Sequence, residues 1–410
     1  MLRWLIFIGV YIIIDFYAFQ AFKTVSKSRI IQVLYWGISL LVLANFIYQL
    51  FINFNRTEGL TTETNQAIGY FLALFIPKIA ILFFVFGEDI IRTPQALFRL
   101  FTEGKSVEET YFPSRRKFVS QLALGIAALP FGALLYGMYK GKYNYKVLKY
   151  TLEFDDLPEA FNGYQLTQIS DIHSGSFDNP KKIAYGVDLI NQQDSDIILF
   201  TGDLVNNKAD EMDPWIDTFK KLSAKDGKYA VLGNHDYGDY VAWESPEAKV
   251  NNLDQLKDVH KKLGFDLLLN THRILEKKGE KIALIGVENW GAGGFKKAGD
   301  LVGASKGVEK EAFKVLMSHD PSHWEQEVKG SDTQYHLTLS GHTHGMQFGI
   351  EIPGWFKWSP VKWRYKYWAG IYQEAGRFIN VNRGFGFLAY PGRVGIWPEI
   401  TVITLKRKVK

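Results

Sequence analysis

The chain contains no cysteine among its 410 residues. This absence excludes disulfide bonds, thiolate metal ligands and a cysteine nucleophile. Any metal ion must therefore be held by oxygen and nitrogen atoms, a donor set that suits manganese, iron and zinc alike. Internal repeats and low-complexity tracts are also lacking, and a hydrophobic content of 47% excludes a disordered chain.

The charge of the chain is weakly biased, with 48 basic and 43 acidic residues and a net charge of +5. Many lysines and arginines flank hydrophobic stretches, where membrane topology accounts for them. We therefore expect no nucleic-acid partner. Residues up to Tyr139 are dominated by leucine, isoleucine, phenylalanine and alanine, whereas the remainder mixes charge normally. This shift predicts a transmembrane region at 1–140 and a soluble domain at 141–410.

Four hydrophobic stretches approach the roughly 20 residues that a helix needs to cross a bilayer. They lie at 4–19, 30–54, 67–86 and 121–139. The first is short and contains Asp15, and the third contains Lys78 next to Pro77, so each could instead be an interfacial or re-entrant helix. Charged residues inside a membrane mark either a functional path or a pair between helices, and both alternatives stay open here.

Basic residues in the short loops set the expected orientation. The loop between the second and third spans holds only Arg56, against Glu58 and Glu63. The loops on the opposite side carry Lys23, Lys27, Arg29, Arg92, Arg99, Lys105, Arg115, Arg116 and Lys117. We therefore expect a multi-pass protein of the cell (inner) membrane with its soluble domain outside the cytoplasm. The four lysines that follow the last span, at 140, 142, 146 and 149, argue the other way, although long domains translocate largely regardless of charge.

A second arginine pattern precedes the fourth span. Residues 114–120 read S-R-R-K-F-V-S and are followed by a weakly hydrophobic run. This order is similar to a twin-arginine export signal in an internal position. A simple cytoplasmic anchor of the span accounts for the same residues.

The soluble segment alternates short β-branched runs with amphipathic stretches, which predicts an α/β fold. Strands are expected at 165–170, 197–201, 230–232, 282–287, 314–317, 337–340, 379–382 and 400–405, and helices at 182–192, 214–224 and 253–263. Most of these strands are followed directly by a potential metal ligand or a charged residue, where open α/β sheets place their ligands.

Five short motifs carry these polar residues. They read S-D-I-H-S-G at 170–175, T-G-D-L-V-N-N at 201–207, L-G-N-H-D-Y at 232–237, S-H-D-P at 318–321 and S-G-H-T-H-G at 340–345. Each alone is explained by turn chemistry, but all five, in order and each at a strand end, indicate one metal site. If the backbone at His342 and His344 is extended, the one-residue spacing sends both imidazoles to the same side.

The motif series resembles the calcineurin-like metallophosphoesterase superfamily over about 163–405. N-R-G-F-G at 382–386 and P-E-I-T-V-I-T-L at 398–405 are similar to the branch of membrane-anchored or exported bacterial phosphoesterases. The resemblance implies a four-layer αββα sandwich that holds two divalent metal ions. The ligands it implies are Asp171, His173 and His344 for one metal, Asn234, His319 and His342 for the other, and Asp203 as the bridge.

The resemblance also implies hydrolysis of a phosphodiester or phosphomonoester. A water that bridges the metals would attack phosphorus in line, and His235 would protonate the leaving oxygen or stabilise the transition state. Asn206 and Tyr237 are expected substrate contacts. The expected substrate is an envelope, lipid-linked or nucleotide phosphoester. A membrane sensor or transporter-associated module that binds a phosphorylated ligand without turnover is the alternative.

Two further features concern the approach to this site. Met346 stands where relatives commonly have a second glycine, which either narrows the pocket or reflects plain packing. Residues 353–368 form an insertion rich in tryptophan, lysine and arginine. Such a segment could dip into a membrane interface, or it could be a surface loop that packs its own aromatic side chains.

Overall fold

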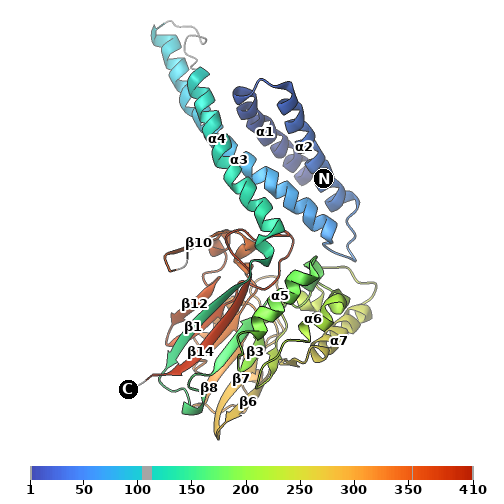
Figure 1. The fold of residues 1–410 in the computed structure, drawn as a ribbon, viewed down its shortest axis with the longest axis vertical. Helices are drawn as coiled ribbons and strands as arrows, with labels where there is room; N and C mark the ends of the chain where they lie inside the picture. The colour runs from blue at the N-terminus through green and yellow to red at the C-terminus, as the bar shows by residue number, and fades with distance from the viewer. Residues whose placement is uncertain (1, 104–112, 353, 409–410) are drawn as a thin grey trace. The chain divides into compact units, whose positions relative to one another are not determined.

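The structure is a computed structural model that describes residues 2–103, 113–352 and 354–408 (Figure 1). Lys105 and Pro353, which entered the expectations above, lie outside the described residues. The chain forms two compact units. We call Met1–Phe54 with Glu63–Met138 the membrane unit, and Asn55–Thr62 with Tyr139–Lys410 the sandwich unit.

The membrane unit consists of long apolar helices. They are α1 (Leu2–Val25), α2 (Arg29–Ile47, continued by a π-helical turn Tyr48–Ile52), α3 (Thr62–Glu103) and α4 (Pro113–Tyr139). All four are long and apolar enough to cross a membrane. Pro77 lies inside α3, which runs without a break from Thr62 to Glu103. Helix α3 continues to Glu103, beyond the expected span at 67–86, because helical hydrogen bonding does not stop at the edge of a hydrophobic window.

The buried charges of the first and third helices face each other. Lys78 Nζ lies 2.8 Å from Asp15 Oδ1, and both side chains are almost fully buried. The carboxylate also accepts hydrogen bonds from Tyr35 and Ser39. Pairing between helices therefore accounts for both residues, and it compensates a charge that would be costly in an apolar medium.

Arg116 of the twin-arginine pattern takes part in a second polar cluster. Its Nη1 lies 2.6 Å from Glu88 Oε2 and 2.9 Å from Asp89 Oδ1, and it donates to the carbonyl of Val85 at 3.0 Å. This cluster ties α4 to α3. The arginine therefore has a structural role of its own, while its role as an export signal stays a hypothesis.

The sandwich unit is built on two six-stranded sheets (Figure 1). The first has the order β1-β14-β2-β3-β4-β5 and the second β12-β13-β9-β8-β7-β6. The first comprises β1 (Lys146–Phe154), β14 (Glu399–Arg407), β2 (Gln165–Ile169), β3 (Ile197–Phe200), β4 (Lys228–Ala230) and β5 (Asp266–Leu267). The second comprises β12 (Gly370–Glu374), β13 (Arg377–Val381), β9 (Leu337–Ser340), β8 (Phe313–Met317), β7 (Glu280–Gly286) and β6 (Thr271–Lys277). A separate hairpin pairs β10 (Ile350–Ile352) with β11 (Phe356–Trp358).

Successive side chains of each strand point to opposite faces of the sheet. One face of each sheet packs on the other sheet and the other face packs on helices, which gives four layers. Leu199 of β3 and Val315 of β8 pack in the core between the sheets. Phe200 points to the opposite face, which is covered by α5 (Pro180–Asn191), α6 (Ile216–Phe219) and α7 (Pro246–Lys262). The outer face of the second sheet packs against α8 (Leu301–Ala304) and the segment around Trp324, which follows α9 (Pro321–His323). The expected αββα sandwich is confirmed.

Most expected elements are present with shifted ends, and two differ. The third expected strand, at 230–232, is displaced, because β4 spans Lys228–Ala230 and the ladder stops where the chain turns toward Asn234. The expected helix at 214–224 is too long, because only 216–219 are α-helical. A 3-10 segment, Ala209–Trp215, precedes the single turn of α6. Glu211 satisfies the backbone N–H groups of residues 206–208, and these bonds fix a tight loop in place of a longer helix.

Candidate metal centre

The candidate ligands lie beyond the carboxyl ends of five parallel-paired strands. Asp171 and His173 follow β2, Asp203 follows β3, and Asn234 and His235 follow β4 of the first sheet. The remaining histidines follow strands of the second sheet: His319 follows β8, and His342 and His344 follow β9. Because both sheets present these ends at the same edge of the sandwich, residues more than 100 positions apart meet.

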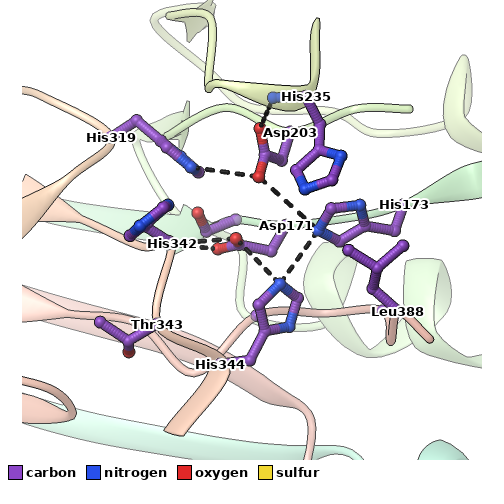
Figure 2. Close-up of polar contacts among 12 residues, drawn as sticks. Asp171, His173, Asp203, His235, His319, His342, Thr343, His344 and Leu388 are labelled. Atoms are coloured by element: carbon purple, nitrogen blue, oxygen red, sulfur yellow. Dashed lines mark hydrogen bonds and ion pairs between the residues drawn. The ribbon is translucent and has the colours of Figure 1, made fainter. Parts of the chain in front are cut away.

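The first group comprises Asp171, His173 and His344 (Figure 2). His344 Nε2 lies 3.2 Å from Asp171 Oδ1 and 3.0 Å from His173 Nε2. All three residues are buried, and one donor atom from each lies within 4.8 Å of the others. These three side chains could hold one metal ion.

The second group comprises Asp203, His319 and His342, with the same mutual proximity of donor atoms. His319 Nε2 lies 3.1 Å from Asp203 Oδ2. Asn234 joins this group, because its Oδ1 lies 2.8 Å from His342 Nδ1. The carboxylate of Asp203 also lies 3.6 Å from His173 Nε2, so it stands between the two groups, as Figure 2 shows.

The backbone of the site is strained at five of these positions. Asp171, His173, Asp203, His342 and His344 all have φ between 49° and 70°, a left-handed region that side-chain-bearing residues rarely adopt. The premise of an extended backbone at 342–344 is therefore wrong, because a tight turn follows β9. The imidazoles nevertheless both reach the site. Strain of this kind persists where surrounding contacts fix a functional geometry.

The donor set suits metal binding. His319 Nδ1 donates to the carbonyl of Thr201 at 2.7 Å, which directs its Nε2 into the site. Burial lowers the pKa of His173, and it also lowers that of His342. Burial opposes protonation of His319 as well, but the carboxylates of Asp203 and Asp171 outweigh it and raise its pKa to about 10. The carboxylates thus favour a positive charge at this position, which a divalent cation would supply.

His235 lies beside these groups. Its backbone N–H donates to Asp203 Oδ1 at 2.8 Å, and its Nδ1 lies 2.7 Å from the carbonyl oxygen of Asn206. The second contact fixes the ring with Nε2 available for a ligand. Burial lowers the pKa of His235, with Asp203 acting in the opposite direction.

The expected substrate contacts occupy different surroundings. Asn206 is buried, donates from Nδ2 to Ser176 at 3.0 Å and orients His235 through its carbonyl. Tyr237 is buried and donates to Glu288 Oε1 at 3.0 Å. Tyr240, which is 46% exposed, packs at a tilt against His235 with ring centroids 4.4 Å apart, and its hydroxyl accepts a hydrogen bond from Asn234 at 2.7 Å. Tyr240 is therefore better placed to meet a ligand than Tyr237.

Three further residues support the ligands, and two of them, Tyr365 and Arg393, have no clear signal in the sequence. Asp236 accepts hydrogen bonds from the backbone N–H groups of residues 203, 204 and 233, and so holds two ligand loops together. Tyr365 places its hydroxyl 2.8 Å from His342 Nε2. Arg393 is fully buried, donates to the carbonyls of residues 384 and 386, and lies 3.2 Å from His344 Nδ1. Only Asp236 lies inside one of the five motifs.

Two family models match the chain, one over its N-terminal helices and one over most of the sandwich unit. Residues 2–142 match the family model described as a probable calcineurin-like phosphoesterase transmembrane domain, and residues 164–346 match the calcineurin-like phosphoesterase model.

Three similar proteins cover much of the chain. The uncharacterised metallophosphoesterase YkuE of Bacillus subtilis is 29% identical over 72% of this chain and 98% of its own length. A transmembrane protein with metallophosphoesterase domain from Danio rerio is 27% identical over 80% of this chain and 71% of its own. The phosphodiesterase YaeI of Escherichia coli is 26% identical over 71% of this chain and 99% of its own.

The two matched models account for well over half of the chain, and the folded sandwich gathers the motif residues at one edge. The protein is therefore a membrane-anchored phosphoester hydrolase that belongs to the calcineurin-like metallophosphoesterases.

Proposed function

We propose that the sandwich unit is a binuclear metal-dependent phosphoesterase. The observation that carries this proposal is the pair of ligand groups on either side of Asp203. Asp171, His173 and His344 would hold one divalent ion. Asn234, His319 and His342 would hold the other, with Asp203 as the bridge and manganese, iron or zinc as the candidates.

Two bound cations would supply Lewis-acid polarisation of a phosphoryl group and acidification of water. The chain itself supplies the position and the proton chemistry. Asn206 holds His235 by its Nδ1, which leaves Nε2 to meet the leaving oxygen of an ester bound at the metal centre. Burial is the main cause that lowers the pKa of His235, and the negative charge of a bound phosphoester would favour the imidazolium that protonates that oxygen.

The proposed substrate is an envelope, lipid-linked or nucleotide phosphoester. The protein is proposed to lie in the cell (inner) membrane with its sandwich unit outside the cytoplasm. Loop charges support this orientation. The loop 55–62 belongs to the sandwich unit, within which Ala242 donates its N–H to the Arg56 carbonyl at 2.8 Å. A chain with four spans puts this loop and the C-terminal unit on the same side of a bilayer, so the contact is compatible with that topology.

The test uses the full-length protein in detergent, stripped of metal and reloaded with Mn²⁺. Bound metal and hydrolysis of bis(p-nitrophenyl) phosphate and p-nitrophenyl phosphate are measured for the native protein, His235→Ala and Asn234→Ala. We expect His235→Ala to retain two metals and to lose about 10²- to 10⁴-fold in kcat, and Asn234→Ala to weaken metal binding. His272→Ala is the matched control, because His272 binds the Ala304 carbonyl away from the site. Two bound metals without turnover of either ester would favour the sensor or transporter module instead.

A further inference from the structure

The hairpin of β10 and β11 has two faces of opposite character. Its strands pair as Ile350 with Trp358, Glu351 with Lys357, and Ile352 with Phe356. Because side chains alternate along a strand, the middle pair points to one face and the two outer pairs to the other. Figure 1 shows the hairpin, labelled β10, at one end of the sheets.

The polar face is bonded to the body of the sandwich. Glu351 forms an ion pair with Arg383 at 2.5 Å, and Arg383 is itself buried against Glu399. Lys357 donates to the carbonyl of Ala369 and to the hydroxyl of Tyr372. These contacts fix the orientation of the hairpin, so its other face is held outward.

The outward face is apolar and exposed. Trp355, at the turn of the hairpin, is 81% exposed, and Trp363, in the turn that follows β11, is 75% exposed. Trp363 packs edge-on against Trp358, with ring centroids 5.9 Å apart. We call this set the interfacial surface: Ile350, Ile352, Trp355, Phe356, Trp358 and Trp363. Exposed Lys362 and Arg364 flank it. An exposed apolar patch rimmed by polar residues marks an interaction site.

The interfacial surface is tied directly to the metal centre. Ser359 donates to the carbonyl of Gly345 at 2.7 Å, next to His344. Tyr365 lies 2.8 Å from His342 Nε2. The segment from 359 to 365 is thus bonded at both ends to the loop that carries two candidate metal ligands. A membrane or molecule bound to the interfacial surface would therefore lie close to those ligands.

We propose that the interfacial surface inserts into the headgroup region of an anionic bilayer and that the metal centre hydrolyses a phosphoester carried by a membrane lipid. Exposed tryptophans together with isoleucines, with cations at the rim, match the chemistry of a membrane interface. Helix α4 ends at Tyr139 and β1 begins at Lys146, so a short connection tethers the sandwich unit to the last expected span. The proposal that the substrate is a lipid phosphoester rests on the proposed function. In that reaction water adds to phosphorus, the P–O bond to the lipid alcohol breaks, and the alcohol leaves with a proton.

The absence of native cysteine provides a direct test of insertion. Full-length protein with a single cysteine, Trp355→Cys or Trp363→Cys, is labelled with an environment-sensitive fluorophore in nanodiscs of phosphatidylglycerol and phosphatidylcholine. We expect blue-shifted emission and quenching by lipids that carry a spin label near the headgroup. Val302→Cys is the matched control, because Val302 is 84% exposed on α8. Labels at 355 and 363 that behave like the label at 302 would overturn the proposal. A blue shift without lipid quenching would also overturn it, since it would indicate a protein partner.

The substrate part is tested by kinetics in the same nanodiscs. For Trp355→Ser with Trp363→Ser, we expect the activity on embedded phosphatidylglycerol, divided by that on bis(p-nitrophenyl) phosphate, to fall about tenfold. Val302→Ser should leave this ratio unchanged. An unchanged ratio in the tryptophan variant, or native protein that cleaves only the soluble ester, would overturn the lipid substrate. Failure to cleave even the soluble ester with metals bound would instead refute the proposed function.

Discussion

The hydroxyl of Tyr365 offers a sharp test of how the second metal group is held. Nδ1 of His342 faces Asn234 and would be the nitrogen that holds a metal, in which case Nε2 would carry the proton and donate to Tyr365, 2.8 Å away. Tyr365→Phe removes only this acceptor and keeps the ring, whose centroid lies 5.4 Å from that of His342. The imidazole then loses the partner that fixes its orientation and basicity.

The expected loss can be bounded from the contacts. One neutral hydrogen bond contributes about 1 kcal/mol, or about fivefold in affinity, whereas loss of a group that orients a metal ligand costs about 10- to 100-fold. Asp320 Oδ2 lies 3.5 Å from His342 Nε2 and can take over part of the role. We therefore expect metal affinity at the second group to fall about tenfold, toward the lower end of that range.

The assay is the Mn²⁺ concentration that gives half-maximal hydrolysis of bis(p-nitrophenyl) phosphate, combined with calorimetric titration of the metal-free protein. One of two binding steps should weaken, and saturating Mn²⁺ should restore most of the activity. Tyr367→Phe is the control, because the Tyr367 hydroxyl donates to Glu374 instead of a histidine. A Tyr365→Phe protein whose Mn²⁺ requirement stays within about twofold of the native value would refute this account of the second group.

Three further outcomes test other parts of the molecule. Burial raises the pKa of Glu211 from 4.5 to about 7 against several backbone hydrogen bonds, so the folded state binds the extra proton and stability should fall as pH rises from 4.5 to 7. Glu211→Gln should remove this dependence, which amounts to about 3 kcal/mol of unfolding free energy between pH 4.5 and 7. Thermal midpoints that change equally with pH in the native and variant proteins would contradict this expectation. Lys78→Ala leaves Asp15 buried without its cation and should destabilise the membrane unit by about 3–5 kcal/mol. Adding Asp15→Ala should recover much of the lost melting temperature in detergent, and no recovery would argue against the pair. Replacement of both Arg115 and Arg116 by lysine should reduce the amount of protein with its sandwich unit outside the cytoplasm, as measured by protease accessibility in spheroplasts, if the pattern acts as an export signal. Unchanged export would rule out the export signal and leave only the structural role of Arg116.

Several features were accessible from the sequence because their causes are local. Span length depends on the hydrophobicity of consecutive residues, so all four membrane helices were anticipated, although α3 and α4 extend beyond their hydrophobic windows. Metal-binding motifs likewise place their ligand types within a few residues of a strand end. The motif residues were therefore identified before the tertiary structure showed that they converge.

Local reasoning was wrong where long-range contacts decided the conformation. The helix expected at 214–224 is shortened to the turn of α6, while Glu211 and its backbone partners fix the preceding loop. The backbone at His342 and His344 is left-handed instead of extended, because a tight turn at the end of β9 brings both imidazoles to the site. A sequence pattern cannot show this, since the strain is balanced by neighbours from other strands.

The sequence by itself determined the type of chemistry, the membrane attachment and the candidate ligands, because each depends on residue identity and short spacing. Tertiary structure alone decided which buried charges pair, which residues support the ligands and which surface faces outward. Arg393 reaches His344 across 49 positions, and Tyr365 reaches His342 across 23. Such contacts arise only when the two sheets and the hairpin pack together. Burial then strengthens each polar contact, because the protein interior has a lower dielectric constant than water.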